Sequence, residues 1–262
     1  TGIEYGDYFR YRSTALVNFG EPINVTEYVN QRKGENEAVI MNGLRELLSE
    51  RLAKQISFVP DNEENYDAIW EMTKIKSELK GDLEQRLERN QKVIKEILEW
   101  KEKEPEKAEE TFGKVKKFIK ERNKKGISVT SVTKKNILGT VLWKTLVAIL
   151  GLPLFAASVV ASLPIWLVTM ILKNVFKDKA WGNTVSFAVE TILHPLLTLL
   201  CIILTFCYMP WELALLCSVF YFFSYIYFVD FKEFLRRWIS DVKWCFNKKL
   251  RSKIEKIMKS MK

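Results

Sequence analysis

Long apolar runs occupy the second half of the chain, at lengths that suit helices crossing a membrane. They cover residues 137–152, 154–172, 185–208 and 211–229. A helical span needs about 20 apolar residues, so the first run is short, and it also contains Lys144. Gly151 and Pro153 are expected to break the helix between the first two runs. The pattern predicts two helical hairpins with four passes, with a re-entrant or interfacial course left open for the first run.

The first half of the chain carries shorter apolar patterns separated by dense charge. Residues 13–19 are β-branched and loosely alternating, which predicts a strand closed by Gly20. Further on, apolar positions recur every three, four or seven residues, as on one face of a helix. Helices are therefore predicted over residues 37–55, 63–100 and 106–125. Pro105 separates the last two, Gly126 is a C-cap signal, and we expect the three to pack against each other or an adjacent domain.

Charge divides the chain into parts. Lys and Arg number 41 and Asp and Glu 32, yet residues 136–230 hold only eight of these side chains, four of each sign. Residues 231–262 hold eleven basic and three acidic side chains, so they account for +8 of the net charge of +9. An apolar block flanked by dense charge is typical of a membrane protein. The predicted parts are residues 1–33, 34–135, 136–230 and 231–262.

The basic tail is also amphipathic. Apolar residues recur every three to four positions from Trp238 to Met261, and basic residues fill the other face. Such a helix can lie in the plane of the membrane surface, and a basic cluster beyond a span is attracted to anionic lipid. We therefore expect the bilayer and its anionic lipids as partners. A coiled-coil or oligomer contact is the alternative, and nucleic acid is disfavoured because the tail is tethered to the bilayer.

The placement of basic residues also predicts a topology. With four passes, residues 103–135, residues 173–182 and the tail all lie on one side, and they hold nearly all of the nearby Lys and Arg. The turns on the opposite side, residues 151–153 and 209–212, hold none. Cytoplasmic segments carry such an excess, so we expect an integral membrane protein with both ends in the cytoplasm.

Catalytic signals are absent from the sequence. His194 is the only histidine, and Glu190 precedes it by one helical turn, so the two form an intramembrane pair for which packing is the simpler role. Three cysteines, Cys201, Cys207 and Cys217, lie in apolar runs and are expected to be buried small side chains. No metal-ligand spacing, glycine-rich phosphate loop or serine elbow occurs. We expect no metal and no cofactor.

The first residues resemble a known family. GIEYGDYFRYRSTALVNFGEPINV, over residues 2–25, resembles the C-terminal end of the acyltransferase domain in the glycerol-3-phosphate and 1-acylglycerol-3-phosphate acyltransferase family. The matching features are Phe9-Arg10, Arg12, the strand Leu16–Phe19 and Gly20-Glu21-Pro22-Ile23. Larger membrane-bound members look like this chain further on, in the same order: Leu44–Leu52, Val59-Pro60-Asp61, a long charged helix, Leu150-Gly151-Leu152-Pro153-Leu154 and Lys177-Asp178.

The resemblance implies a fold and an activity. The expected fold is mainly α, with polytopic membrane helices preceded by a helical region and by the terminal strand edge of an α/β acyltransferase domain (residues 1–33). The implied reaction transfers an acyl group from a thioester donor, acyl-CoA or acyl carrier protein, to a glycerol phosphate in phospholipid synthesis.

The family's catalytic residues have no counterpart in this chain. Its His-x4-Asp pair and its Glu-Gly-Thr-Arg-like motif do not occur here and would precede Thr1. Because the chain starts with Thr1 and shows no leader, we expect a fragment that is inactive alone. Arg10 and Arg12 are the only candidates to bind the substrate phosphate, with a surface or fold-supporting role as the alternative. The competing function is a non-catalytic, membrane-anchored helical module that binds anionic lipid or a protein partner.

Overall fold

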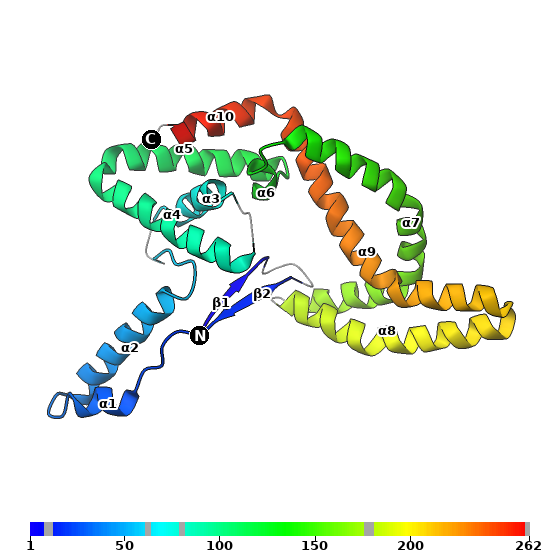
Figure 1. The fold of residues 1–262 in the computed structure, drawn as a ribbon, viewed down its shortest axis with the longest axis horizontal. Coiled ribbons are helices and arrows are strands. Elements are labelled where there is room, and N and C mark those ends of the chain that lie inside the picture. Colours follow the sequence, from blue (N-terminus) through cyan, green and yellow to red (C-terminus); the bar gives the residue numbers. More distant parts are fainter. Residues whose placement is uncertain (8–12, 61–63, 79–81, 176–180, 260–262) are drawn as a thin grey trace. The chain divides into compact units, whose positions relative to one another are not determined.

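The computed structural model describes residues 1–7, 13–60, 64–78, 82–175 and 181–259, and they are mainly helical (Figure 1). The described residues form two compact units. The helical unit comprises Thr1–Asp7, Ser13–Lys135 and the segment that starts at Asn247. The three-helix unit comprises Asn136–Phe246. The mainly helical class predicted from the sequence is therefore confirmed.

A small antiparallel sheet opens the helical unit. It pairs β1 (Gly2–Tyr5) with β2 (Ala15–Asn18), so that Ile3 lies opposite Val17. The predicted strand over residues 13–19 is thus found as β2. Ile3 and Val17 are exposed although they are large and apolar. Two strands alone have little stability in water, and this pair leaves apolar surface uncovered.

Helices form the rest of the helical unit. They are α1 (Val25–Asn30), α2 (Glu37–Ala53), α3 (Tyr66–Lys76), α4 (Leu83–Lys103), α5 (Pro105–Lys124), α6 (Val129–Val132) and α10 (Lys248–Lys259). The single helix predicted over residues 63–100 is wrong, because α3 ends at Lys76 and α4 starts after Asp82. Glu78 has a φ of 57°, which a helix cannot contain, and the Asp82 side chain accepts a hydrogen bond from the Gln85 backbone N–H. The apolar positions keep a helical spacing across this break, which is why the sequence pattern indicated one helix.

The core of this unit lies between α3, α4 and α5. Its fully buried side chains are Ile69, Met72, Ile97, Phe112, Val115 and Phe118. Pro105 occupies the first turn of α5, where its missing N–H costs nothing. Gly126 follows α5 with a φ of 64°, the left-handed conformation that the C-cap signal predicted.

The C-terminal segment departs from the predicted tail. Residues up to Phe246 continue the preceding helix, and a separate helix, α10, starts after Asn247, whose side chain accepts a hydrogen bond from the Leu250 N–H. The apolar residues of α10, Leu250, Ile254 and Ile257, are buried, and α10 packs along α5. Its apolar face is therefore covered by protein, which leaves the basic face outward.

One buried ion pair holds α3 to α5. Arg122 Nε lies 2.7 Å from Glu71 Oε1, and Arg122 Nη2 donates to Glu71 Oε2 at 3.0 Å. Arg122 Nη1 also donates to the Ile127 carbonyl at 2.6 Å, so the guanidinium ties the end of α5 to the chain that follows it. Both side chains are buried, so each charge depends on the other.

Arg122→Met is expected to destabilise the helical unit by about 3–5 kcal/mol, because it leaves Glu71 buried without its partner. Urea unfolding of the full chain in detergent, followed by helical circular dichroism, measures the change. Lys95→Met is the matched control, since Lys95 lies 3.9 Å from Glu99 in an exposed pair worth less than about 1 kcal/mol. Equal stability of the two variants would contradict the structural role of the pair.

A second, exposed contact joins α5 to α10 and depends on pH. Lys253 Nζ donates to Glu121 Oε1 at 2.5 Å. This hydrogen bond lowers the pKa of Glu121 from its ordinary 4.5, helped by the charges of Lys253, Lys249 and Lys125 and opposed by desolvation. The stabilisation is thus complete above 4.5 and is lost as the pH falls through the lower pKa of the folded state.

Hydrogen exchange of the α10 amides tests this contact. Protection is expected to decrease modestly as the pH falls below 4.5, after correction for the intrinsic exchange rate. Glu121→Gln should remove that pH-dependent step, because its side chain does not titrate. A step of the same size in both proteins would assign it to another group.

The three-helix unit consists of α7 (Ile137–Val175), α8 (Trp181–Tyr208) and α9 (Trp211–Phe246). Within the described residues these three helices are each long enough and apolar enough to span a membrane. The predicted break between the first two apolar runs is wrong, because one helix runs through Gly151 and Pro153 and also contains Pro164. Proline removes one backbone hydrogen bond and kinks a helix that continues through it, and α7 is strongly curved in Figure 1.

The bend changes the topology argument. At about 1.5 Å per residue, a straight helix of this length would exceed the hydrocarbon core by a wide margin. The charge argument rested on four separate apolar helices, and the described residues contain three that are long and apolar enough to span a membrane. The apolar helices support association with a membrane, and the cytoplasmic placement of both ends stays a prediction.

Candidate site among the apolar helices

An ion pair joins the start of α7 to the end of α9. Lys144 Nζ donates to Asp241 Oδ2 at 2.7 Å, and Asp241 is fully buried. One residue further along α7, the Thr145 hydroxyl accepts a hydrogen bond from Trp238 Nε1 at 2.9 Å. Lys144, which made the first apolar run look unsuitable as a membrane segment, is therefore neutralised by an acid from the segment predicted to be the tail.

Aromatic side chains of α9 pack into the bend of α7. The Tyr227 hydroxyl donates to the Gly151 carbonyl at 3.0 Å. A Cβ at Gly151 would collide with the Phe231 ring, so only glycine permits this approach. The ring of Phe155 lies 5.1 Å from that of Phe231 and 6.0 Å from that of Phe228. The packing of α9 thus fixes the curvature of α7. The part of α7 that follows the bend, which we call its second arm, is directed toward α8.

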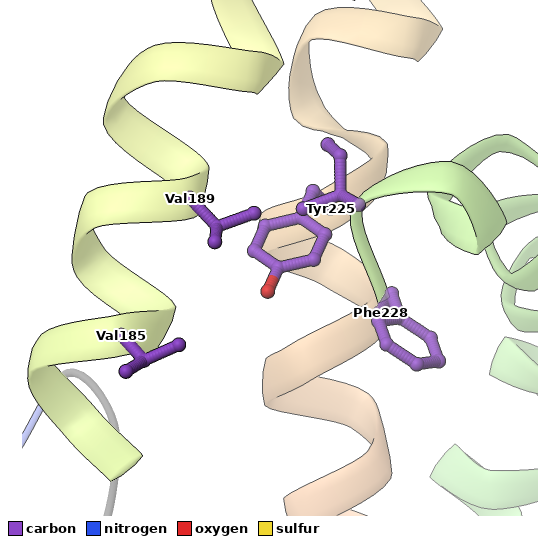
Figure 2. Packing of buried hydrophobic residues seen from close by; sticks show 5 residues of the cluster. Val185, Val189, Tyr225 and Phe228 are labelled. Atoms are coloured by element: carbon purple, nitrogen blue, oxygen red, sulfur yellow. The ribbon is translucent and has the colours of Figure 1, made fainter. Parts of the chain in front are cut away.

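All three helices contribute to one apolar core. Its buried members are Ile165 of α7, Val185 and Val189 of α8, and Tyr225 and Phe228 of α9. Figure 2 shows Val185 and Val189 pointing from α8 toward α9. Tyr225 brings a hydroxyl into this core, where it is hydrogen-bonded to the Thr169 side chain. A pair of hydroxyl groups therefore lies within or beside this apolar core.

Four charged residues lie beside this core, and we call them the three-helix polar site: Lys173, Glu190, Asp230 and Lys232. Glu190 of α8 and Asp230 of α9 are close enough for their charges to interact, as are Lys173 of α7 and Lys232 of α9. Lys232 Nζ also lies 5.9 Å from the Trp166 ring centroid and 5.7 Å from that of Phe228. Each helix thus contributes at least one charge at the edge of the apolar core.

In the part of the chain that the structure describes, no hydrogen bond joins Glu190 to His194, the pair that the sequence suggested. Both residues lie on α8, and His194 is buried against the rings of Tyr221, Phe222 and Tyr225 at 6.1–6.4 Å. Among the described residues, neither Glu190 Oε2 nor His194 Nε2 has a hydrogen-bond partner, although both atoms are buried. Glu190 instead interacts with Tyr225 and Asp230. The histidine is packed against aromatic rings, as the simpler interpretation expected.

The chemistry of the site suits binding better than catalysis. Two lysines near an apolar surface attract anionic headgroups, and the adjacent indole and phenyl rings are side chains of the kind found at membrane interfaces. Within the described residues no group of three or more His, Cys, Asp and Glu side chains could hold a metal. Cys201 and Cys217 are half-buried, whereas Cys207 is exposed, so the expectation that it is buried was wrong. It lies on an apolar surface that a membrane would cover.

The two predicted substrate-binding residues, Arg10 and Arg12, lie outside the described residues. The sequence did not single out Lys173, Asp230 or Lys232. Lys173 was assigned to a polar connection and Lys232 to the tail, so they were counted in different parts of the chain. Only the length of α7 and α9, which run past those predicted boundaries, brings them into one unit.

Comparisons with protein-family models, with curated proteins and with solved structures find no match to this chain.

Replacing both lysines tests the three-helix polar site. Lys173→Gln with Lys232→Gln is expected to weaken the retention of a phosphate-bearing lipid by roughly fivefold for each charge removed. Native mass spectrometry of the detergent-solubilised full chain, titrated with phosphatidic acid, measures the bound fraction. Lys243→Gln is the control, because Lys243 is an exposed lysine of α9 outside the site. If the control and the double variant lost phosphatidic acid binding equally, the three-helix polar site would have no specific role in that binding.

Proposed function

We propose that this chain is the membrane-anchored C-terminal part of an acyltransferase of phospholipid synthesis, which transfers an acyl group from acyl-CoA or acyl carrier protein to a glycerol phosphate. The observation that carries the proposal is the order of the motifs, from Phe9-Arg10 through Gly20-Glu21-Pro22-Ile23 to Lys177-Asp178. Each motif alone is only moderately specific. Their common order, followed by three apolar helices, supports the assignment.

The sheet is compatible with the proposed domain edge. Ile3, Tyr5 and Val17 of the β1–β2 pair are exposed, and so is Phe19 just beyond it. In the proposal, these side chains belong to the edge of a larger α/β sheet, which would cover them. Arg10 and Arg12, between the two strands in sequence, are then the candidates to reach the phosphate of the acceptor.

The three-helix unit supplies the lipid side of the proposed reaction. The acyl chain and the acylated product are both amphiphiles, so they partition to the boundary between hydrocarbon and water. The three-helix polar site combines lysines with aromatic rings at the edge of an apolar core and would hold such a molecule by its headgroup. The acid–base chemistry belongs, in this proposal, to sequence that precedes Thr1.

Acyl transfer is the direct test of this function. A protein extended upstream of Thr1 to include a His-x4-Asp motif should acylate glycerol-3-phosphate or its 1-acyl derivative, and the present chain alone should not. Replacing the histidine of that motif by alanine in the extended protein is the control, because the His accepts the hydroxyl proton. A folded extension that carries the motif and remains inactive with both acyl donors would refute the proposal.

A non-catalytic module that binds anionic lipid or a protein partner is the second candidate. It is favoured by the absence of an acid–base constellation from the described residues and by the basic charge of the C-terminal segment. The upstream sequence distinguishes the two functions, since only the first needs a His-x4-Asp motif there. Removing the chain after Asp230 is not a clean test of lipid binding, because Asp241, the partner of Lys144, would be lost as well.

A further inference from the structure

We infer that the outer face of the α5–α10 pair is an electrostatic docking surface for an anionic membrane. This lysine face consists of Lys117, Lys120, Lys124 and Lys125 in and just after α5, and Lys249, Lys253 and Lys256 in α10. The inference deepens the proposed binding of anionic lipid and moves it from a tail lying in the membrane surface to a folded surface built from two helices. It rests on the membrane assignment and not on the acyltransferase reaction.

Helical spacing places the α5 lysines on one side. Positions 117, 120 and 124 follow at intervals of three and four residues, so they share a face, and Glu121 lies one turn after Lys117 on the same side. Val115, Phe118 and Arg122 lie on the opposite, buried side of the same helix. Lys117, Lys120 and Lys124 are exposed. Their charges therefore point away from the core of the helical unit.

Glu121 shows that the lysines of the two helices gather in one place. It accepts a hydrogen bond from Lys253 of α10, and its charge also interacts with Lys249 of α10 and Lys125 beyond the end of α5. Two lysines of α10 and the C-cap lysine of α5 thus lie near one carboxylate. Glu255 is an exposed acid of α10 as well, and with both acids counted the seven lysines leave a local charge of about +5 at neutral pH.

The covered apolar side of α10 decides how this surface can act. Leu250, Ile254 and Ile257 are only 1%, 5% and 4% exposed, because they pack against the helical unit. A helix that lies in the membrane surface needs such residues for the acyl region. In this fold α10 offers only charge, so its attraction to lipid must depend on ionic strength.

Chain connectivity selects a membrane over nucleic acid as the partner. Asn247 alone separates α10 from the last residue of α9, which is long and apolar enough to span a membrane. The first lysines of α10 are therefore held within a few residues of a helix that enters the bilayer. Anionic headgroups are then available at high local concentration. Each nearby Lys is attracted to them about as strongly as other basic residues that flank a membrane-spanning helix.

Lysine labelling in nanodiscs tests the proposal with the full chain. Nanodiscs of phosphatidylcholine are compared with nanodiscs in which about one-third of the lipid is phosphatidylglycerol, a fraction that gives a strong negative surface potential. Amine-reactive labelling is read out by peptide mass spectrometry. The lysine face should react roughly fivefold more slowly in the anionic nanodiscs, and about 1 M salt should abolish the difference.

Substitutions in α5 separate the lysine face from a tail that acts alone. Lys117→Gln, Lys120→Gln and Lys124→Gln together should reduce the protection of Lys249 and Lys256, because all belong to one surface. The matched control replaces three exposed lysines of α4: Lys92→Gln, Lys95→Gln and Lys103→Gln. Undiminished protection of α10 in the α5 variant would overturn the two-helix surface.

Two other outcomes also overturn the inference. Equal labelling in neutral and anionic nanodiscs would show that lipid charge is not recognised. A duplex RNA added to neutral nanodiscs that protects the lysine face as strongly as anionic lipid would assign the surface to nucleic acid. A chain that fails to enter nanodiscs would remove the membrane assignment itself, whereas a failed acyl-transfer assay would leave the docking surface untouched.

Discussion

The outer faces of α7, α8 and α9 are apolar and need hydrocarbon rather than water around them. The rest of the structure depends on this constraint. Side chains such as Leu142, Leu150, Ile192 and Leu216 are mostly exposed on these helices. In water, so much apolar surface would drive association, whereas hydrocarbon accepts it and demands only that backbone polar groups be satisfied internally. Continuous helices meet that demand, and charged side chains of the described unit include the Lys144–Asp241 pair, the Glu233–Arg236–Arg237 cluster near the end of α9 and the three-helix polar site.

Periodicity and charge predicted the broad architecture because both are local properties of the sequence. The apolar runs, the separation of charge, the strand at β2 and the start of α5 at Pro105 were all visible in this way. The predictions that were wrong concerned features that depend on contacts between residues far apart in the sequence. Pro153 was expected to end a helix, but Tyr227 and Phe231 of α9 pack around the bend and keep one helix continuous. The tail was expected to contact lipid through Leu250 and Ile254, but α5 covers them.

The candidate site was less accessible to prediction than the fold. Glu190 and His194 attracted attention because they are close in sequence, whereas Lys173 and Lys232 are 59 positions apart. No local pattern relates two lysines at that distance. Their proximity follows from the second arm of α7 turning back across α9, which in turn needs a glycine at position 151. The lysine face has the same origin, since Glu121 and Lys253 are 132 positions apart in the sequence.

The two prolines inside α7 have a mechanical consequence. Each removes a backbone hydrogen bond, so the carbonyls four residues earlier, those of Ile149 and Val160, lose their regular partner. The series of backbone hydrogen bonds gives a helix its stiffness, so α7 is least stiff around these two prolines. When the thickness of the surrounding bilayer changes, helices adapt by tilting or bending at small cost. Helix α8 contains a proline of its own, Pro195, whereas α9 has none. In this unit the adjustment would therefore be shared between α7 and α8, around Pro164 and Pro195 more than at Pro153, where Tyr227 of α9 holds the bend.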